Sequence, residues 1–310
     1  MGRRSSLPPA LWACLLGLAA GWRSVGALAE PARAAEVWPL PRRLQASGPA
    51  VQLSADFRIE LIGGSAGQHS ELLRLGIGRY AAIIANSSSA RWPRAQNLPP
   101  SPQLQPQPQQ PQQQPPPQQQ QQQQLAILRV LVTTDSEDLG SRTCYNYTMS
   151  VRPGGGGGGT TAEVSAVTPY GALYGLESFA QLVGPGGWLP GTSIELDDYP
   201  EYSFRGLMVD TGRRFWPLEL LQSTVDAMAS VKLNVLHLHF ADNCRVAVES
   251  KVLPNLTASL TGPHSGFLSQ DELRALVAYA RLRGVSAAAC RTTMLLSVPT
   301  TTPCHRSQCG

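Results

Sequence analysis

Apolar residues recur with two different periods along the chain, and these periods predict strands and helices. Residues 57–62 alternate between apolar and polar, which is typical of a half-buried strand, whereas residues 69–84 place their apolar side chains on one helical face. Four further elements follow: strands at 125–133, 145–151 and 162–167, and a helix at 169–182. This mixture predicts an α/β sandwich domain within residues 36–200.

A second pattern starts near residue 203. It begins with a short apolar strand at 205–210 and a helix that opens at Pro217, a residue favoured in the first helical turn. A strand at 234–240, a helix at 269–283 and a third strand beginning at Val285 complete it. Strands that alternate with helices are typical of the start of a parallel barrel or a doubly wound sheet, here over residues 203–285.

Two segments interrupt these patterns. Residues 99–124 contain 15 Gln and 9 Pro, and residues 154–159 are six consecutive glycines. Neither composition can bury an apolar core, so we expect a disordered surface loop at 96–124 and a lengthened hairpin loop at the glycines. With 42% apolar and 15% charged residues overall, the composition indicates a globular protein with inserts and argues against an acidic disordered tail.

The first 29 residues are typical of a cleaved secretory signal. Arg3 and Arg4 precede an apolar run at 10–20, and small residues stand at 27–29. The run is shorter than the roughly 20 apolar residues that cross a bilayer, so we expect no stable membrane insertion. Removing this segment with its three arginines lowers the formal charge from +4 to +1. No broad basic face remains, and we expect no nucleic-acid partner.

Three N-glycosylation sequons agree with a secretory route, at Asn86, Asn146 and Asn255. The route predicts an extracellular, cell-wall, vacuolar or lysosomal location. The cysteines are weaker evidence for secretion. Five of them follow the signal, and this odd number leaves at least one without an internal disulfide partner. A zinc site at Cys304, His305 and Cys309 is one reading of the C-terminal cluster, but no second ligand pair stands at the usual spacing.

The strand at 234–240 carries the first candidate chemistry. Its period of two places His237 and His239 on one face, which points inward in a barrel, and Asp242 follows at the end of the strand. Asp210 takes the equivalent place after the strand at 205–210. Such a group can hold a metal, orient a sugar hydroxyl or fix an imidazole tautomer, and hydrogen-bonded histidines within a barrel are the simplest interpretation.

Several consecutive motifs resemble glycoside hydrolase family 20, the β-N-acetylhexosaminidases. The motifs are Phe204–Pro217 (FRGLMVDTGRRFWP), Lys232–His239 (KLNVLHLH), Glu249–Lys251, Pro254–Leu256, Tyr279–Val285 (YARLRGV) and, upstream, Thr168–Phe179 (TPYGALYGLESF). The resemblance covers most of residues 36–285 outside the inserts. It implies an α/β fold, with an accessory domain at 36–200 followed by the first two or so βα units of a TIM barrel, which is therefore incomplete.

The resemblance also implies a reaction and assigns residues. The family removes terminal N-acetylglucosamine or N-acetylgalactosamine with retention, using the acetamido oxygen of the sugar as nucleophile, and needs no cofactor or metal. Arg205 is then expected to bind substrate hydroxyls, with a buried ion pair to Asp210 as the alternative. Asp210, His237, His239 and Asp242 are expected to support the pocket. Family members often form dimers, so a homodimer of the full-length form is expected.

The catalytic Asp-Glu pair of the family ends the fourth barrel strand and has no counterpart in this chain. Asp271 and Glu272 are adjacent, but they stand in the first turn of a predicted helix, where Glu272 caps with Ser269. No acid occurs in the unmatched tail at 286–310, which a retained intron, an alternative exon or a frame shift would produce. We therefore expect no hexosaminidase activity from these 310 residues.

Two other classes of function stay open at this point. One is a stable non-catalytic product that binds glycans or acts as a dominant-negative partner in a dimer. The other is a Gln/Pro-rich regulatory protein, although the secretory signal and the lack of a basic DNA-reading element argue against it. The sequence does not distinguish glucosaminide from galactosaminide preference.

Overall fold

The fold is known from a computed structural model, which describes residues 37–63, 70–88, 124–154, 159–242, 245–258, 260 and 266–290. The predicted signal, nearly all of the Pro/Gln-rich insert, the cysteine–histidine cluster near the C-terminus and the tail after residue 290 lie outside these ranges. Among the described residues, no helix combines the length and the apolar character needed to cross a membrane.

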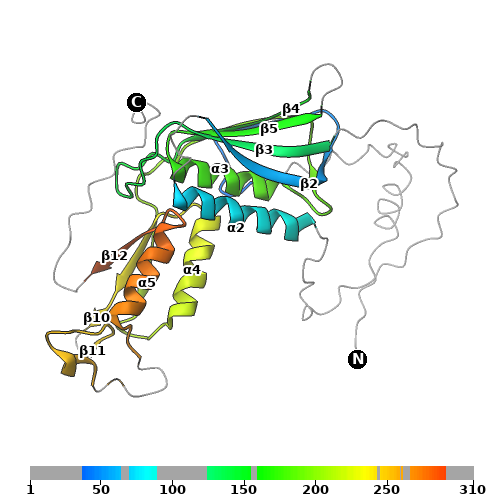
Figure 1. The fold of residues 1–310 in the computed structure, drawn as a ribbon. Coiled ribbons are helices and arrows are strands. Elements are labelled where there is room, and N and C mark those ends of the chain that lie inside the picture. Colours follow the sequence, from blue (N-terminus) through cyan, green and yellow to red (C-terminus); the bar gives the residue numbers. More distant parts are fainter. Residues whose placement is uncertain are drawn as a thin grey trace, which may run out of the picture. The chain divides into compact units, whose positions relative to one another are not determined.

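A seven-stranded sheet with two helices on one face forms the first part of the described chain (Figure 1). Its elements are β1 (Arg43–Ser47), β2 (Val51–Ile62), α2 (Glu71–Ser88), β3 (Gln124–Val132), β4 (Tyr147–Arg152), β5 (Thr160–Ala166), α3 (Pro169–Leu182), β6 (Trp188–Leu189) and β7 (Ser193–Asp198). The strand order is β1-β7-β4-β5-β3-β2-β6; β3 runs parallel to β2 and β5, and the remaining pairs are antiparallel.

Alternation along the strands divides this sheet into an apolar and a polar face. In β4, Tyr147, Met149 and Val151 are buried toward the helices, whereas Thr148 and Arg152 are exposed. Helix α3 is buried along nearly its whole length because it packs closely on β4 and β5. Gly175 permits that approach, since a Cβ there would clash with the side chain of Val164.

The sequence predicted most of these elements. The helix at 169–182 is confirmed with its bounds, and β2 extends the predicted strand toward the N-terminus. Strands β1, β6 and β7 were not predicted. The sequence SIELDD of β7 ends in two acids, and β6 has only two residues, so hydrogen bonding to neighbouring strands stabilises both where local propensity is weak.

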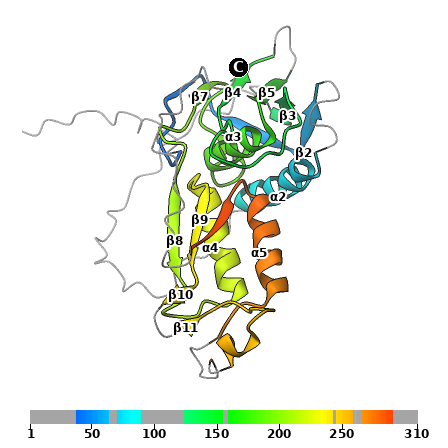
Figure 2. The ribbon, with the colours of Figure 1, turned by 90° about the vertical axis from the view of Figure 1, so that its left-hand side faces the viewer.

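Three parallel strands with two helices form the second part, as predicted for the start of a barrel (Figure 2). The elements are β8 (Gly206–Asp210), α4 (Leu218–Ser230), β9 (Val235–His239), β10 (Ala241–Asp242), β11 (Arg245–Val246), a 3-10 turn at Pro254–Thr257, α5 (Gln270–Arg281) and β12 (Ser286–Cys290). The order is β12-β9-β8, and β10 with β11 forms a separate antiparallel ribbon.

The two faces of the three-stranded sheet differ in burial. Leu236 and Leu238 of β9 are fully buried in a cluster with Leu221 and Val225 of α4 and Leu276 of α5. The other face carries Met208, His237 and Ala288 side by side in register, and Met208 is 59% exposed. In a closed barrel this face lines the axis, so the described residues form an accessory α/β domain followed by the first part of a TIM barrel.

Candidate functional site

The carboxyl ends of the parallel strands bring Asp210 and His239 together. Asp210 ends β8 and His239 ends β9, and the two residues are direct neighbours in the register of the sheet. Arg213 lies three residues beyond Asp210, its Nε 3.4 Å from Asp210 Oδ2, while its backbone N–H donates to Asp210 Oδ1 at 2.9 Å. Barrel enzymes place their sites at this end of the strands.

The turn that presents Arg213 is held against the end of β9. Thr211 is fully buried and donates through Oγ1 to the carbonyl of His239 at 3.2 Å, and the Gly212 N–H donates to the same carbonyl at 2.9 Å. A Cβ on Gly212 would lie 3.1 Å from backbone atoms of Phe240 and Ala241, tighter than ordinary packing. The turn is therefore fixed by the buried Thr211 side chain together with close backbone contact at Gly212.

The predicted histidine and aspartate group is only partly assembled in the described residues. His237 lies one layer below His239 on the same face, and its Nε2 is buried without a described hydrogen-bond partner. Asp242 lies in β10, where it is the backbone neighbour of Arg245 in the register with β11. The structure does not describe the side chain of Asp242. No cluster of three or more His, Cys, Asp or Glu side chains suited to a metal ion is found among the described residues.

Arg205 lies at the opposite end of β8 from Asp210, about 16 Å away for five residues of extended chain. Its guanidinium donates to the carbonyls of Lys232 (2.9 Å) and Tyr202 (2.5 Å) and to the hydroxyl of Tyr174 (2.7 Å). It also lies 4.9 Å from the centroid of the Tyr145 ring. The three guanidinium nitrogens of Arg205 are thus engaged within the chain, and Asp210 pairs with Arg213 and not with Arg205. The substrate-binding role expected for Arg205 stays a prediction.

Lys232 joins the barrel strands to the accessory domain. Its ammonium donates to Asp198 Oδ2 (2.9 Å), Ser178 Oγ (2.9 Å) and the Tyr147 hydroxyl (2.7 Å), and only 6% of its side chain is exposed. Tyr147 donates in turn to Asp198 Oδ2 at 3.0 Å. All three N–H donors of the ammonium are therefore satisfied by groups from β4, α3 and β7.

The backbone of Lys232 explains how its side chain reaches this position. Lys232 has a φ of 58°, in the left-handed region that follows many helices. Its N–H donates to the carbonyl of Ala229 and the next N–H to the carbonyl of Met228, which is the Schellman pattern at the end of α4. Glycine is usual at this position, so lysine carries a conformational cost that the buried network offsets.

Burial changes the acid–base properties of this network. It lowers the pKa of Lys232, although the neighbouring Asp198 carboxylate acts against this. The pKa of Tyr147 lies well above its usual range because of burial and the nearby Asp198 carboxylate. Since the ammonium is fully hydrogen-bonded, we assign it a structural and not a nucleophilic role.

Glu177 in α3 provides a prediction about pH. It is 9% exposed, accepts a hydrogen bond from Gln181 at 2.8 Å, and burial raises its pKa. Stability from this group is thus fully present below the ordinary glutamate pKa and is lost as pH rises through the raised value. Glu177→Gln should raise the urea midpoint at pH 7 and leave it nearly unchanged at pH 4. An equal effect at both pH values would contradict the assignment.

The Asp271–Glu272 pair lies at the start of α5, as predicted. Ser269 Oγ accepts from the Glu272 N–H at 3.1 Å, and Glu272 Oε2 accepts from the Ser269 N–H at 2.7 Å, which confirms the capping box. The Asp271 side chain is 90% exposed and pairs with Arg274. Both acids therefore serve the helix end.

The cap supplies a second prediction. Ser269→Ala should lower the free energy of unfolding by about 1 kcal/mol, because the N–H of Glu272 loses its acceptor. Chemical denaturation checks this, with Ser269→Asp as the matched variant that restores an acceptor. If Ser269→Asp destabilises the protein as much as Ser269→Ala, the cap does not contribute as described.

The sequons occupy different surroundings. Asn86 lies in the last turn of α2 and Asn255 in the 3-10 turn, and both are exposed. Asn146 precedes β4 and is half-buried. Cys144 is disulfide-bonded. Glycosylation at the three asparagines stays a prediction.

Two family models match the chain over the parts described above. Residues 202–288 match the "Glycosyl hydrolase family 20, catalytic domain", and residues 37–182 match the model "beta-acetyl hexosaminidase like". The chain belongs to glycoside hydrolase family 20. This family membership confirms the resemblance inferred from the motifs, and the two matched ranges correspond to the accessory sheet and to the β8–β12 part.

Curated family 20 relatives and solved family 20 structures are similar to the chain. It is 30% identical to beta-hexosaminidase subunit alpha of Rattus norvegicus and 27% identical to beta-hexosaminidase 1 of Arabidopsis thaliana, with 81% of the chain and 44% of each relative covered. The Flavobacterium johnsoniae chitobiase structure matches with a TM-score of 0.61 at 22% identity, covering 81% of this chain and 34% of that one. The chain thus spans less than half the length of these relatives.

Sequence reasoning missed two residues of this family 20 chain. Arg213 follows Asp210 by three residues, and a strand end was already recognised there, so its position at the same edge was a usable signal. Lys232 was named only as the first residue of the motif KLNVLHLH. Its partners lie 34 to 85 residues away in the sequence, and no local pattern indicates them.

Proposed function

We propose that this chain contributes the accessory domain and the first barrel units of a β-N-acetylhexosaminidase. The enzyme would remove terminal non-reducing N-acetylglucosamine or N-acetylgalactosamine from glycoconjugates by substrate-assisted, retaining hydrolysis. The observation that carries the proposal is the ion pair of Arg213 with Asp210, which lies beside His239 at the carboxyl ends of the barrel strands in a chain of this family.

Arg213, in place of Arg205, is the substrate-binding candidate in this proposal. A guanidinium presents several N–H donors in one plane, which suits two adjacent sugar hydroxyls, and Asp210 can orient it from the side. Its side chain is 74% exposed in the turn beyond the carboxyl end of β8, where a ligand can reach it. Asp210, His237, His239 and Asp242 remain the proposed supporting residues.

The same proposal explains why residues 1–310 alone should not hydrolyse substrate. The described part of the barrel contains three parallel strands of the eight that close it. The adjacent acids Asp271 and Glu272 lie at the start of α5, where Glu272 completes the capping box and Asp271 pairs with Arg274. A catalytic acid and an orienting aspartate would have to come from further barrel strands.

A chromogenic assay tests this function. The purified 310-residue chain and a chimera that continues from residue 288 into the matching C-terminal part of the rat subunit alpha are incubated with p-nitrophenyl N-acetylglucosaminide and galactosaminide. We expect release of p-nitrophenol by the chimera and none by the 310-residue chain. Robust release by the latter would overturn the proposed division, and a folded but inactive chimera would overturn the proposed function.

A second candidate is a secreted, non-catalytic glycan-binding form. The exposed Arg213 beside Asp210 at the carboxyl end of β8 favours it, because these groups can bind a sugar without hydrolysing it. N-Acetylglucosamine would then raise the melting temperature of the 310-residue chain, and Arg213→Ala would abolish that shift. The disulfide at Cys144 supports passage through the secretory pathway in either case. The expected homodimer stays a prediction.

A further inference from the structure

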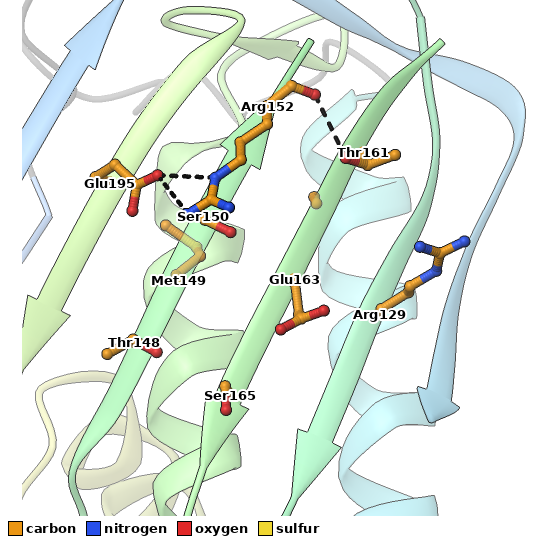
Figure 3. A pocket seen from close by; sticks show the side chains of 10 residues that line it. Arg129, Thr148, Met149, Ser150, Arg152, Thr161, Glu163, Ser165 and Glu195 are labelled. Atoms are coloured by element: carbon orange, nitrogen blue, oxygen red, sulfur yellow. Dashed lines mark hydrogen bonds and ion pairs between the residues drawn. The ribbon is translucent and has the colours of Figure 1, made fainter. Parts of the chain in front are cut away.

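The polar face of the seven-stranded sheet carries two hollows that no described element covers. One, of about 300 Å³, is lined by Asn146, Thr148, Ser165, Asp197 and Tyr199, among others. The other, of about 350 Å³, shares Thr148 and Ser165 with it (Figure 3). Because the two hollows share these two residues, they form one groove that begins at Asn146.

The side chain of Asn146 lines this groove. Its Oδ1 is buried and has no hydrogen-bond partner among the described residues, whereas its Nδ2 is not among the buried, unpartnered atoms. By the alternation of β4, Asn146 and Thr148 lie on the polar face, opposite the buried Tyr147. Asn146 and Thr148 are the acceptor and the hydroxyl residue of one sequon.

Hydroxyl and charged side chains line the second hollow, and groups of this kind can form hydrogen bonds with sugars. The second hollow contains the hydroxyls of Ser150 and Thr161, and Figure 3 shows Glu163 between Ser150 and Arg129. Arg129 and Glu163 are direct neighbours in register, yet neither forms a hydrogen bond or an ion pair with another described residue. Arg152 differs, since it is already paired with Glu195 at 3.1 Å. Among the described residues, Arg129 and Glu163 therefore offer unpaired donors and acceptors beside the hydroxyls of Ser150 and Thr161.

We propose that the N-linked glycan of Asn146 lies along this groove. The first N-acetylglucosamine would occupy the hollow beside Thr148 and Tyr199, and the following sugars would reach the hollow beside Glu163 and Arg129. Hollows of this size hold small ligands, for which about 300–1,000 Å³ is usual. The mainly polar lining of the hollow beside Glu163 and Arg129 suits the hydroxyls of a carbohydrate. This inference rests on the proposed passage through the secretory pathway.

Site-resolved release of glycans tests the proposal. The chain secreted from cultured cells is treated with a peptide N-glycosidase under native conditions, and mass spectrometry follows Asn86, Asn146 and Asn255 separately. A glycan held by one or two hydrogen bonds must detach before cleavage, so we expect release from Asn146 to be about tenfold slower than from the other two. Denaturation should abolish the difference.

Variants connect the protection to the groove. Ser165→Lys fills the part that both hollows share and should raise the native release rate at Asn146 to that of Asn86. Thr161→Lys is a second, exposed variant in the farther hollow and should act in the same direction. Ala55→Lys, on β2 outside both hollows, is the matched control and should leave the rate unchanged. Melting temperatures show that each variant is folded.

The outcomes separate this inference from the proposed route. If Asn86 and Asn255 carry glycans but Asn146 does not, or if native release is equal at all three, the groove does not hold a glycan. Unchanged protection in both lysine variants would also overturn it. If none of the three asparagines is glycosylated, the proposed secretory passage fails and the inference fails with it.

Discussion

Lys232→Met should lower the free energy of unfolding by about 3–5 kcal/mol, the cost of removing one partner from a buried charge pair. Asp198 would keep a carboxylate that is 13% exposed, with the Tyr147 hydroxyl as its remaining donor in this network. Methionine has nearly the length of lysine, so the change removes the charge with little change in packing. Urea denaturation followed by circular dichroism measures the loss.

Two controls accompany this measurement. Lys251→Met changes the other lysine of the chain, which is exposed, and should have little effect. Asp198→Asn combined with Lys232→Met removes both charges and should recover part of the loss. If the double variant is less stable than Lys232→Met alone by the full cost of Asp198→Asn, the two groups act independently and the network is not a unit.

Arg213→Ala should lower kcat/KM of the active chimera by about 30- to 150-fold, which corresponds to about 2–3 kcal/mol for a lost charged hydrogen bond to the substrate. Arg214→Ala is the matched control, because Arg214 is the next residue and is also exposed. Steady-state kinetics on the p-nitrophenyl substrates provides the measurement. Equal losses in the two variants would contradict the role of Arg213.

Arg205→Met in the same chimera should reduce stability and not kcat/KM, the opposite of what we expect for Arg213→Ala. Arg205 donates to two carbonyls and one tyrosine hydroxyl at the amino end of β8. Its loss should lower the free energy of unfolding by about 2–4 kcal/mol, while kcat/KM per folded molecule changes little. A large rise in KM with unchanged stability would return the substrate-binding role to Arg205.

The sequence predicted those parts of the fold that depend on local pattern. The apolar stripe and capping box of α5, the helix α3 and the alternation of β9 are each contained within one element. Short strands such as β6 escaped prediction because their stability comes from neighbours. The position of Arg205 depends on Tyr145 and Tyr174, which lie in the accessory domain, and no spacing within the arginine motif indicates them.

The candidate site shows the same division. Barrel enzymes place their sites at the carboxyl ends of their strands, and this rule identified Asp210 correctly as a residue of that edge. The position of Asp210 follows from one strand and its direction. The rule could not decide whether Arg205 or Arg213, which lie at opposite ends of β8, is the better substrate-binding candidate. That decision needs the register of β8 against β9 and the turn held by Thr211, which are contacts between segments about 30 residues apart.

The residues of the Lys232 network are also synthesised in a fixed order. Tyr147, Ser178 and Asp198 all precede Lys232 in the chain, so the three acceptors leave the ribosome before the lysine does. Domains generally fold as units from the N-terminus during translation, at about 5–20 residues per second. The accessory sheet can therefore be in place when α4 emerges, and the first barrel strands meet a surface that already holds the binding partners of their buried charge.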